Sequence, residues 1–402
     1  MRKLNVVHVC DHLGWTGSRM HGVKRLFAWM IPRFDPERFT VSLISLRGQD
    51  ESEDNLERFG IDVTYLGRGR FDPRTLPALL RVLKEKQVDI LHMHGYGATT
   101  FGRAAAAWLG TPTVVHEHAN LTSTPWFQQV ADELLLPFTD LGIAVSRSTA
   151  EFLTQARRLP PHLTRVVYLG APASEFGRVR TADEIREGRA ALGVPDGAFA
   201  VGTVTRLMPS KGNQYLVDAI PQVLAAAPDT CFYIVGEGEL EDDLKAQAEA
   251  LGVRDRLRFV GFMRDVSLAY AALDLVVFPS LWEGTPLTAF EALAMGRPIV
   301  ATDCDGLLDI LTPEVDARIV PRRDATALAD AILALRDDAP ARDRLGRAAR
   351  ETGAFYDIDR FVRKMEQLYE LMHEVSRPTH RQGVAKADLS FLAREAHPRI
   401  EG

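Results

Sequence analysis

The chain has 402 residues, of which 46% are hydrophobic and 25% charged, and this composition is typical of an ordinary soluble globular protein. Its length favours two domains, each large enough to form its own core. The formal net charge of −6 argues against a nucleic-acid-binding protein, which would normally carry a basic excess.

The cysteines and the hydropathy exclude further classes of protein. Cys10, Cys231 and Cys304 are widely spaced beside apparent strand residues, a pattern typical of buried thiols in a reducing compartment and not of a zinc site or a disulfide framework. No apolar stretch approaches the length needed to span a bilayer, and the N-terminus is too short for a signal sequence. We therefore expect a cytoplasmic protein, with peripheral contact to a membrane left open.

Short apolar runs alternate with helical patterns through the first part of the chain. The predicted strands are residues 4–10, 39–46, 61–66, 90–94, 113–117, 141–145 and 166–169, and the predicted helices are residues 24–31, 55–59, 76–86, 102–109 and 149–155. This alternation predicts a mostly parallel, doubly wound sheet.

A glycine-rich segment with Gly14, Gly17 and Gly22 joins the first predicted strand to the first predicted helix. Such a turn lets backbone N–H groups approach an anion at a helix N-terminus. The glycine spacing is not G-x-G-x-x-G, so a dinucleotide site, and with it a dehydrogenase, is the least supported alternative. We interpret the segment as a flexible loop that faces a phosphate or an acceptor.

A second strand and helix alternation follows an irregular stretch. Residues 170–190 are rich in Gly, Pro, Ala and charge, and we interpret them as the interdomain connection. The second set of predicted strands is residues 199–205, 231–235, 257–260, 275–278, 299–301 and 317–320. The expected organisation is an N-terminal domain at 1–175, a C-terminal domain at 190–355, an amphipathic crossover helix at 356–376 and an irregular tail at 377–402.

Two carboxylates lie eight positions apart in the second domain. Glu283 is predicted in the loop after a buried strand, and Glu291 in the following helix. Open parallel α/β sheets bind ligands at this end of their strands. The helix would orient Glu291 toward a polar partner such as paired ribose hydroxyls, and Glu283 toward the reacting end of the same ligand. Taken alone the pair would be a turn residue and a solvated helix residue, but the surrounding signals favour a ligand site.

Two basic residues follow the first strand of the second domain. Arg206 and Lys211 lie five positions apart in a loop that ends in Gly212. From such a loop a guanidinium and an ammonium group can converge on one diphosphate. There they would stabilise the negative charge that grows as a nucleotide leaves.

The segments Val235-Gly-Glu-Gly-Glu239, Phe259-Val-Gly-Phe262, Glu283–Glu291 and Ala294–Val300 resemble the retaining GT-B glycosyltransferases with the E-x7-E motif, the group 1 or family 4 type. The resemblance implies two Rossmann-like α/β domains facing a cleft, with the C-terminal helix crossing back to the first domain. It implies metal-independent transfer of a sugar, with retention of configuration, from a UDP-sugar or GDP-sugar to a hydroxyl of a glycan, a lipid-linked sugar or a small metabolite. Such a reaction belongs to polysaccharide, glycolipid or other glycoconjugate biosynthesis, and no cofactor is expected.

The resemblance also implies roles for individual residues. The implied catalytic residues are His118, Arg206, Lys211 and Glu283, and the implied donor-binding residues are Gly14, Gly17, Arg206, Lys211, Gly236, Met263, Glu283, Gly284, Thr285, Pro286, Leu287, Thr288 and Glu291. Leu287 and Thr288 would offer backbone N–H groups to the diphosphate. Met263 begins a loop whose backbone would contact the base.

Histidines lie at the ends of two consecutive predicted strands, residues 90–94 and 113–117. Alternation along a strand puts His116 and His118 on one face and Glu117 on the other. A neutral imidazole at His118 could donate to a sugar hydroxyl. His92 and His94 end the preceding strand, which by the resemblance faces the acceptor. The four histidines lack the tight cysteine or carboxylate spacing of a metal site, so no metal is expected.

Two departures from the family pattern keep alternatives open. The chain has Thr285-Pro286 and Asp305-Gly306 where the family usually has other residues around the donor sugar. These departures leave the donor sugar undetermined, and they keep a catalytically degenerate GT-B protein that serves as a scaffold as an alternative. A GT-B sugar-nucleotide epimerase shares the fold, but Arg206 and Lys211 together with Glu283 and Glu291 are the transferase pattern.

Overall fold

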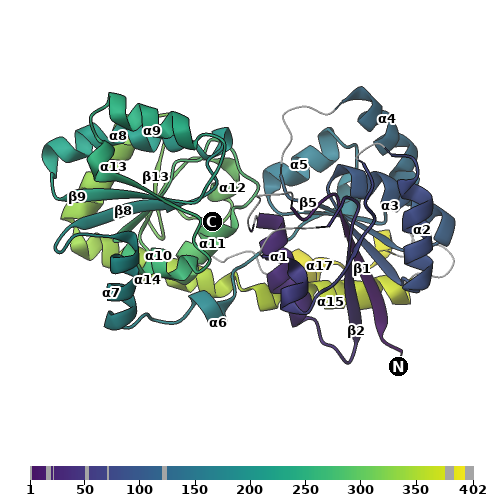
Figure 1. The fold of residues 1–402 in the computed structure, drawn as a ribbon. Coiled ribbons are helices and arrows are strands. Elements are labelled where there is room, and N and C mark those ends of the chain that lie inside the picture. Colours follow the sequence, from purple (N-terminus) through teal and green to yellow (C-terminus); the bar gives the residue numbers. More distant parts are fainter. Residues whose placement is uncertain are drawn as a thin grey trace. The chain divides into compact units, whose positions relative to one another are not determined.

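The computed structural model describes residues 2–14, 20, 22–49, 54–69, 72–119, 125–375 and 384–393. These residues form two compact units (Figure 1). The N-terminal unit holds the described residues up to Tyr168 and those from Ile358 onward, and the C-terminal unit runs from Leu169 to Asp357. Within the described ranges, no helix is both long and apolar enough to cross a bilayer.

A parallel seven-stranded sheet with the order β3-β2-β1-β4-β5-β6-β7 is the centre of the N-terminal unit. Its strands are β1 (Leu4–Cys10), β2 (Phe39–Ser45), β3 (Asp62–Tyr65), β4 (Ile90–His94), β5 (Thr113–Glu117), β6 (Leu141–Ala144) and β7 (Thr164–Val166). Its main helices are α1 (Gly22–Met30), α2 (Thr75–Glu85), α3 (Tyr96–Leu109), α4 (Trp126–Leu135) and α5 (Arg147–Gln155). Helices on both faces bury the central strands, which explains their nearly continuous apolar runs.

The predicted elements of this unit are confirmed, with differences at their ends. The last strand, β7, ends at Val166, whereas the predicted strand of residues 166–169 begins at this residue. Helix α3 begins six residues before the predicted start because the Asp11 carboxylate accepts hydrogen bonds from the N–H groups of Gly97 (3.2 Å) and Ala98 (2.6 Å). The predicted cap of α5 is confirmed, since the Ser146 hydroxyl accepts from the Thr149 N–H. Helix α4 was not predicted.

A parallel six-stranded sheet with the order β10-β9-β8-β11-β12-β13 is the centre of the C-terminal unit. Its strands are β8 (Phe199–Val204), β9 (Thr230–Val235), β10 (Leu257–Gly261), β11 (Leu275–Phe278), β12 (Ile299–Thr302) and β13 (Arg318–Val320). Its helices include α6 (Ala173–Phe176), α7 (Ala182–Leu192), α8 (Asn213–Ala226), α9 (Glu241–Ala250), α10 (Val266–Ala272), α11 (Leu287–Ala294), α12 (Asp305–Leu308), α13 (Ala325–Asp337) and α14 (Ala339–Phe355).

The interpretation of residues 170–190 as a plain connection is wrong. Helix α7 begins in this stretch, because Thr181 and Glu184 form a capping box in which each side chain accepts from the other residue's backbone N–H. Two backbone N–H groups of the first turn are thereby satisfied. The charged residues of the stretch belong to a helix that packs on α10 of the same unit.

Helix α15 (Ile358–Glu374) belongs to the N-terminal unit although it follows the C-terminal unit in sequence. In Figure 1 it lies with the short helix α17 (Ser390–Ala393) against the strands of that unit. The Glu366 carboxylate accepts from the Asp35 N–H at 2.7 Å, and Arg38 pairs with both Glu366 and Glu370. Phe361 and Tyr369 are buried on its inner face.

Candidate active site

The segments that follow β8, β9, β10 and β11 carry most of the predicted site residues. These loops lie together because the carboxyl ends of parallel strands meet at one edge of a sheet. Arg206 follows β8, and its side chain is exposed with no hydrogen-bond or ion-pair partner in the described part of the chain. Lys211 ends a short 3₁₀ helix (Pro209–Lys211) that leads into α8.

Lys211 and Glu283 form an ion pair. The Lys211 ammonium lies 2.6 Å from Glu283 Oε1, which also accepts from the Ser280 hydroxyl at 2.9 Å. The two side chains are 16% and 10% exposed, so the pair is mostly withdrawn from water and yet reachable. An ammonium group has three N–H donors, so Lys211 keeps two for other acceptors.

Two glycines set the close approach of the loops around this pair. Gly212 has a φ of 62°, and a Cβ there would lie 2.0 Å from the Pro279 carbonyl oxygen. A Cβ on Gly306 would lie 1.4 Å from the Gly284 carbonyl oxygen. This contact requires a glycine at position 306, because the loop after β12 packs directly on the backbone beside Glu283.

The loop after β9 packs between the loops after β8 and β10. Gly236 has a φ of 133°, its Cβ would lie 1.8 Å from the Thr205 carbonyl oxygen, and its N–H donates to the Gly261 carbonyl at 2.8 Å. Glu237 Oε1 accepts from the Phe262 N–H at 3.2 Å, which ties this loop to the half-buried Met263. Gly236 thus acts as a turn former at the predicted site.

Glu291 lies on the buried face of α11 and not on a solvated one. Its side chain is 0% exposed, and the Tyr270 hydroxyl lies 2.9 Å from both Glu291 Oε2 and the Thr288 carbonyl oxygen. The predicted residues at the start of the same helix are buried or half-buried: Gly284, Thr285, Pro286, Leu287 and Thr288.

His118 belongs to the N-terminal unit, directly after β5. As predicted, it shares a face with His116, at a ring distance of 4.2 Å, and Glu117 points to the other face. Glu117 pairs there with Arg157 at 2.9 Å. Burial lowers the pKa of His118 to about 4, so its imidazole is neutral at physiological pH.

The end of β4, which we expect to face the acceptor, carries two buried histidines. His92 is fully buried, and its Nδ1 lies 2.6 Å from the Tyr369 hydroxyl on α15. His94 is also buried, and its Nδ1 lies 2.8 Å from His118 Nε2.

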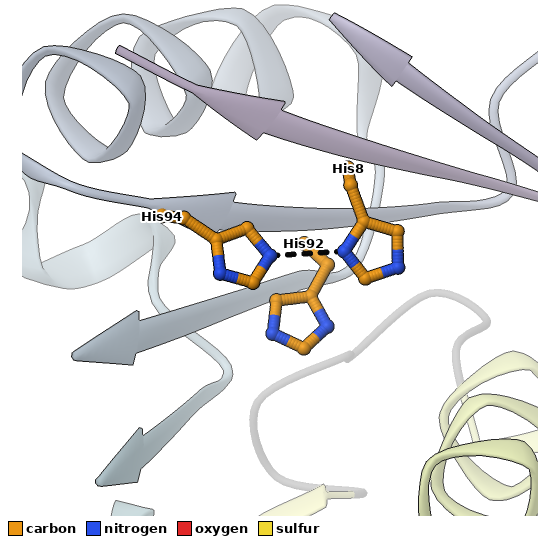
Figure 2. A group of neighbouring side chains, drawn as sticks. All are labelled: His8, His92 and His94. Carbon is orange, nitrogen blue, oxygen red and sulfur yellow. Dashed lines mark hydrogen bonds between the residues drawn. The ribbon is translucent and has the colours of Figure 1, made fainter. Parts of the chain in front are cut away.

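Two overlapping groups of histidines are close enough to hold a metal ion: His8, His92 and His94, and His94, His116 and His118. Figure 2 shows the first group, in which His8 Nδ1 and His94 Nε2 lie 2.9 Å apart. That separation is a hydrogen-bond distance. Nitrogens at tetrahedral positions about 2.0–2.1 Å from zinc lie about 3.3 Å apart. The spacing thus fits neutral imidazoles bonded to each other better than ligands around an ion.

Gly14, of the predicted glycine-rich loop, is half-buried after β1, and Gly17 lies outside the described residues. Sequence reasoning missed Ser280 and Tyr270, the partners of the two carboxylates. It also missed Asn213, the first residue of α8, which is fully buried and whose amide atoms have no hydrogen-bond partner among the described residues. A buried amide without a partner is rare in folded proteins, and this one directly follows the Lys211-Gly212 turn.

Both units match known families. Residues 20–175 match the model of Glycosyltransferase Family 4, and residues 198–338 match that of Glycosyl transferases group 1. Together, the two matches and the two parallel-sheet units support a GT-B glycosyltransferase. The first family domain lies almost wholly in the N-terminal unit, and the second, which carries Arg206, Lys211, Glu283 and Glu291, lies in the C-terminal unit.

Individual relatives cover most of this glycosyltransferase. The UDP-Gal:alpha-D-GlcNAc-diphosphoundecaprenol alpha-1,3-galactosyltransferase of Escherichia coli is 26% identical over 333 residues, which cover 79% of this chain and 86% of the relative. The phosphatidyl-myo-inositol mannosyltransferase of Mycobacterium leprae is 27% identical over 328 residues, covering 77% and 81%. The crystal structure of Anabaena HepE in complex with UDP is similar with a TM-score of 0.77 and 22% identity, covering 91% of this chain and 100% of that chain. This similarity shows the shared fold.

Proposed function

We propose that the protein is a retaining, metal-independent glycosyltransferase that moves a sugar from a nucleoside diphosphate sugar to an acceptor hydroxyl. The observation that carries this proposal is the ion pair between Lys211 and Glu283, 2.6 Å apart at the carboxyl end of the sheet. The Lys211 ammonium suits a phosphate, and the Glu283 carboxylate suits sugar hydroxyls. The bond to be broken joins the sugar to the diphosphate, so the pair would lie beside that bond.

Each charged group has a distinct task in this proposal. When the bond between the anomeric carbon and the phosphate oxygen breaks, negative charge grows on the leaving diphosphate. Arg206, which has no partner in the described residues, and Lys211, with two remaining N–H donors, would stabilise that charge. The two side-chain cations would supply the charge that a metal ion supplies in other enzymes, and on this ground we propose that no metal is needed.

The remaining residues would hold the donor. Glu291 would bind the ribose hydroxyls after exchanging contacts with Tyr270, and the free backbone N–H groups of Leu287 and Thr288 would bind the diphosphate. Gly236 and Met263 would line the nucleotide side. Glu283 and His118 would hold the sugar.

A lipid-linked acceptor at a membrane surface fits the outer face of α4. Trp126, Val130 and Leu134 form one stripe along this helix, and Trp126 and Leu134 are 76% and 70% exposed. The opposite face is held in the protein by Asp132, which pairs with Arg103 and Arg157 in a buried network. A helix anchored by its polar face with an apolar stripe outward suits the bilayer interface. The names of the two relatives, which contain diphosphoundecaprenol and phosphatidyl-myo-inositol, support a lipid-linked acceptor.

Thermal stabilisation by a panel of UDP-, GDP- and ADP-sugars, with NAD as the control, tests the donor assignment. A ligand that binds only the native state raises the melting temperature by mass action. We expect one nucleotide series to stabilise the protein and NAD to have no effect, and the UDP in the E. coli relative's name makes UDP-sugars the first choice. No shift with any sugar nucleotide at concentrations far above ordinary affinities would favour the scaffold alternative.

A further inference from the structure

Five histidines meet on one face of the N-terminal sheet. His8 on β1 lies opposite His92 on β4, and His94 lies opposite His116 on β5. His118 continues the row directly after β5. Figure 2 shows how rings from the two neighbouring strands β1 and β4 point to the same side. All five residues belong to the N-terminal unit.

The ring nitrogens of these histidines and the Tyr369 hydroxyl form one unbranched chain of contacts. In order, the contacts are His118 Nε2 to His94 Nδ1 (2.8 Å), His94 Nε2 to His8 Nδ1 (2.9 Å), His8 Nε2 to Tyr369 Oη (3.4 Å), Tyr369 Oη to His92 Nδ1 (2.6 Å) and His92 Nε2 to His116 Nδ1 (3.1 Å). Each nitrogen is used once, and Tyr369 joins the two halves.

Such a chain has a direction. A neutral imidazole has one N–H donor and one bare acceptor nitrogen, and burial lowers the pKa of all five histidines, so all are neutral at pH 7. Once one ring donates along the chain, each following ring must donate in the same sense. A hydroxyl can accept two hydrogen bonds, but if Tyr369 accepted from both His8 and His92, its own buried O–H would have no acceptor among the described residues. Tyr369 therefore donates to one of them and accepts from the other, and the protons point either all toward His118 or all toward His116.

The His116 end favours one of the two directions. His116 Nε2 is buried and has no hydrogen-bond partner among the described residues. If the chain donated toward His116, this nitrogen would carry a buried, unpaired N–H, which is the rarer kind of unsatisfied group in folded proteins. If the chain donates toward His118, the same nitrogen is a bare acceptor. The second direction makes His118 Nε2 an acceptor and leaves the proton on His118 Nδ1.

We propose that Tyr369, through the buried histidines, holds His118 in the tautomer that carries its proton on Nδ1 and donates it to a substrate hydroxyl. Tyr369 is then a positioning residue contributed by α15, 251 positions from His118 in the sequence. The role of His118 toward substrate rests on the proposed function, whereas the tautomer itself does not. The chain carries no net proton transfer, and its protons stay on the same rings throughout.

The test is the tautomer of His118, measured by nitrogen-15 NMR on histidine-labelled full-length protein at pH 7.5. We expect wild-type His118 to show protonated Nδ1 and bare Nε2. Tyr369→Phe keeps the ring stacked on Phe34 but removes the hydroxyl that joins the halves, so His118 should then populate both tautomers and kcat should fall on the order of tenfold with unchanged donor affinity. Met365→Leu is a conservative change on the buried face of the same helix. It should change neither the tautomer of His118 nor kcat.

Three outcomes would overturn the proposal. His118 could carry its proton on Nε2 in the wild type, or Tyr369→Phe could leave the tautomer as it was. Alternatively, one equivalent of zinc could shift the signals of His94, His116 and His118 together with sub-micromolar affinity, and the cluster would then be a metal site. A failure of the proposed transferase function is a separate result, since it would appear as wild-type protein without activity while the tautomer remains measurable.

Discussion

At the residue scale, Lys211 is the group whose removal should affect turnover most. It lies 2.6 Å from Glu283 and, in our proposal, contacts the leaving diphosphate. We expect Lys211→Ala to lower turnover on the order of 100-fold or more, as the loss of one transition-state donor typically does. Steady-state rates at saturating donor measure this. Lys245→Ala is the matched control, because Lys245 pairs with Glu241 at 2.7 Å on α9 and should keep wild-type turnover. Wild-type turnover in Lys211→Ala would remove its catalytic assignment.

Glu291 offers a second test, which separates a role in binding the nucleotide from a purely structural role as the partner of Tyr270. Loss of a charged hydrogen-bonding group costs about 1.5–3 kcal/mol, so Glu291→Ala should weaken nucleotide binding about tenfold or more, measured by calorimetry. Tyr270→Phe removes only the hydroxyl that contacts Glu291 and should leave the affinity within a few-fold of wild type. If the two variants lost affinity equally, Glu291 would be a structural partner of Tyr270 and not a ribose ligand.

The sequence predicted which residues carry charge at the site but not what they contact. Lys211 and Glu283 were both predicted, yet they are 72 positions apart and their ion pair depends on the packing of two loops. Tyr270 and Tyr369 have no local sequence signal at all. Each is an ordinary aromatic residue of a helix, and only the tertiary structure brings its hydroxyl to a carboxylate or an imidazole.

At the element scale, the strands were predictable because both faces of a parallel sheet are covered. Their near-continuous apolar runs, such as 4–10 and 275–278, are distinctive. The helices that were missed lack a run of that kind. Helix α4 directs its apolar stripe outward, and α7 is polar apart from a few buried positions, so its capping box at Thr181 was the available signal.

The outward stripe of α4 leads to a test of membrane contact. We expect Trp126→Gln combined with Leu134→Gln to weaken binding to phosphatidylcholine and phosphatidylglycerol vesicles at least tenfold, since each buried side chain contributes about 1.5–3 kcal/mol. Sedimentation with vesicles measures the binding, and circular dichroism verifies the fold. Trp282→Gln, at an exposed tryptophan of the C-terminal unit, is the control and should bind as wild type does. Wild-type protein that stays in the supernatant would contradict the membrane proposal.

At the scale of the whole molecule, the two units differ in their histidines. The N-terminal unit gathers five in one cluster, four of them buried and His118 half-buried, and no histidine occurs between residues 169 and 357. The units share a parallel α/β architecture, so the difference does not come from the fold. It comes from histidine side chains on three adjacent strands, whose neutral state costs little only while the pH stays above the ordinary histidine pKa of about 6.5. The two units should therefore respond differently to acid.

We expect the N-terminal unit to lose stability first as the pH falls below about 6.5. Burial lowers the pKa of His8 to about 3 and that of His118 to about 4, and it lowers the pKa of the other three as well. The unfolded chain, with ordinary pKa values near 6.5, binds these protons first. The stability that the neutral cluster contributes is thus complete above pH 6.5 and is lost progressively toward pH 4, by about 1.4 kcal/mol for each histidine and each pH unit.

Urea unfolding at pH 7.5, 6.5, 5.5 and 4.5, followed by hydrogen exchange of peptides from each unit, measures this difference. Five protons taken up on unfolding would remove the 5–15 kcal/mol that stabilises a typical domain within about two pH units. The midpoint for peptides of β1, β4 and β5 should therefore fall steeply below pH 6.5. Peptides of β8 and β11 serve as the internal control, because the sequence has no histidine between residues 169 and 357. Parallel midpoints for both units across this range would mean that the five rings are not buried and neutral in the folded protein.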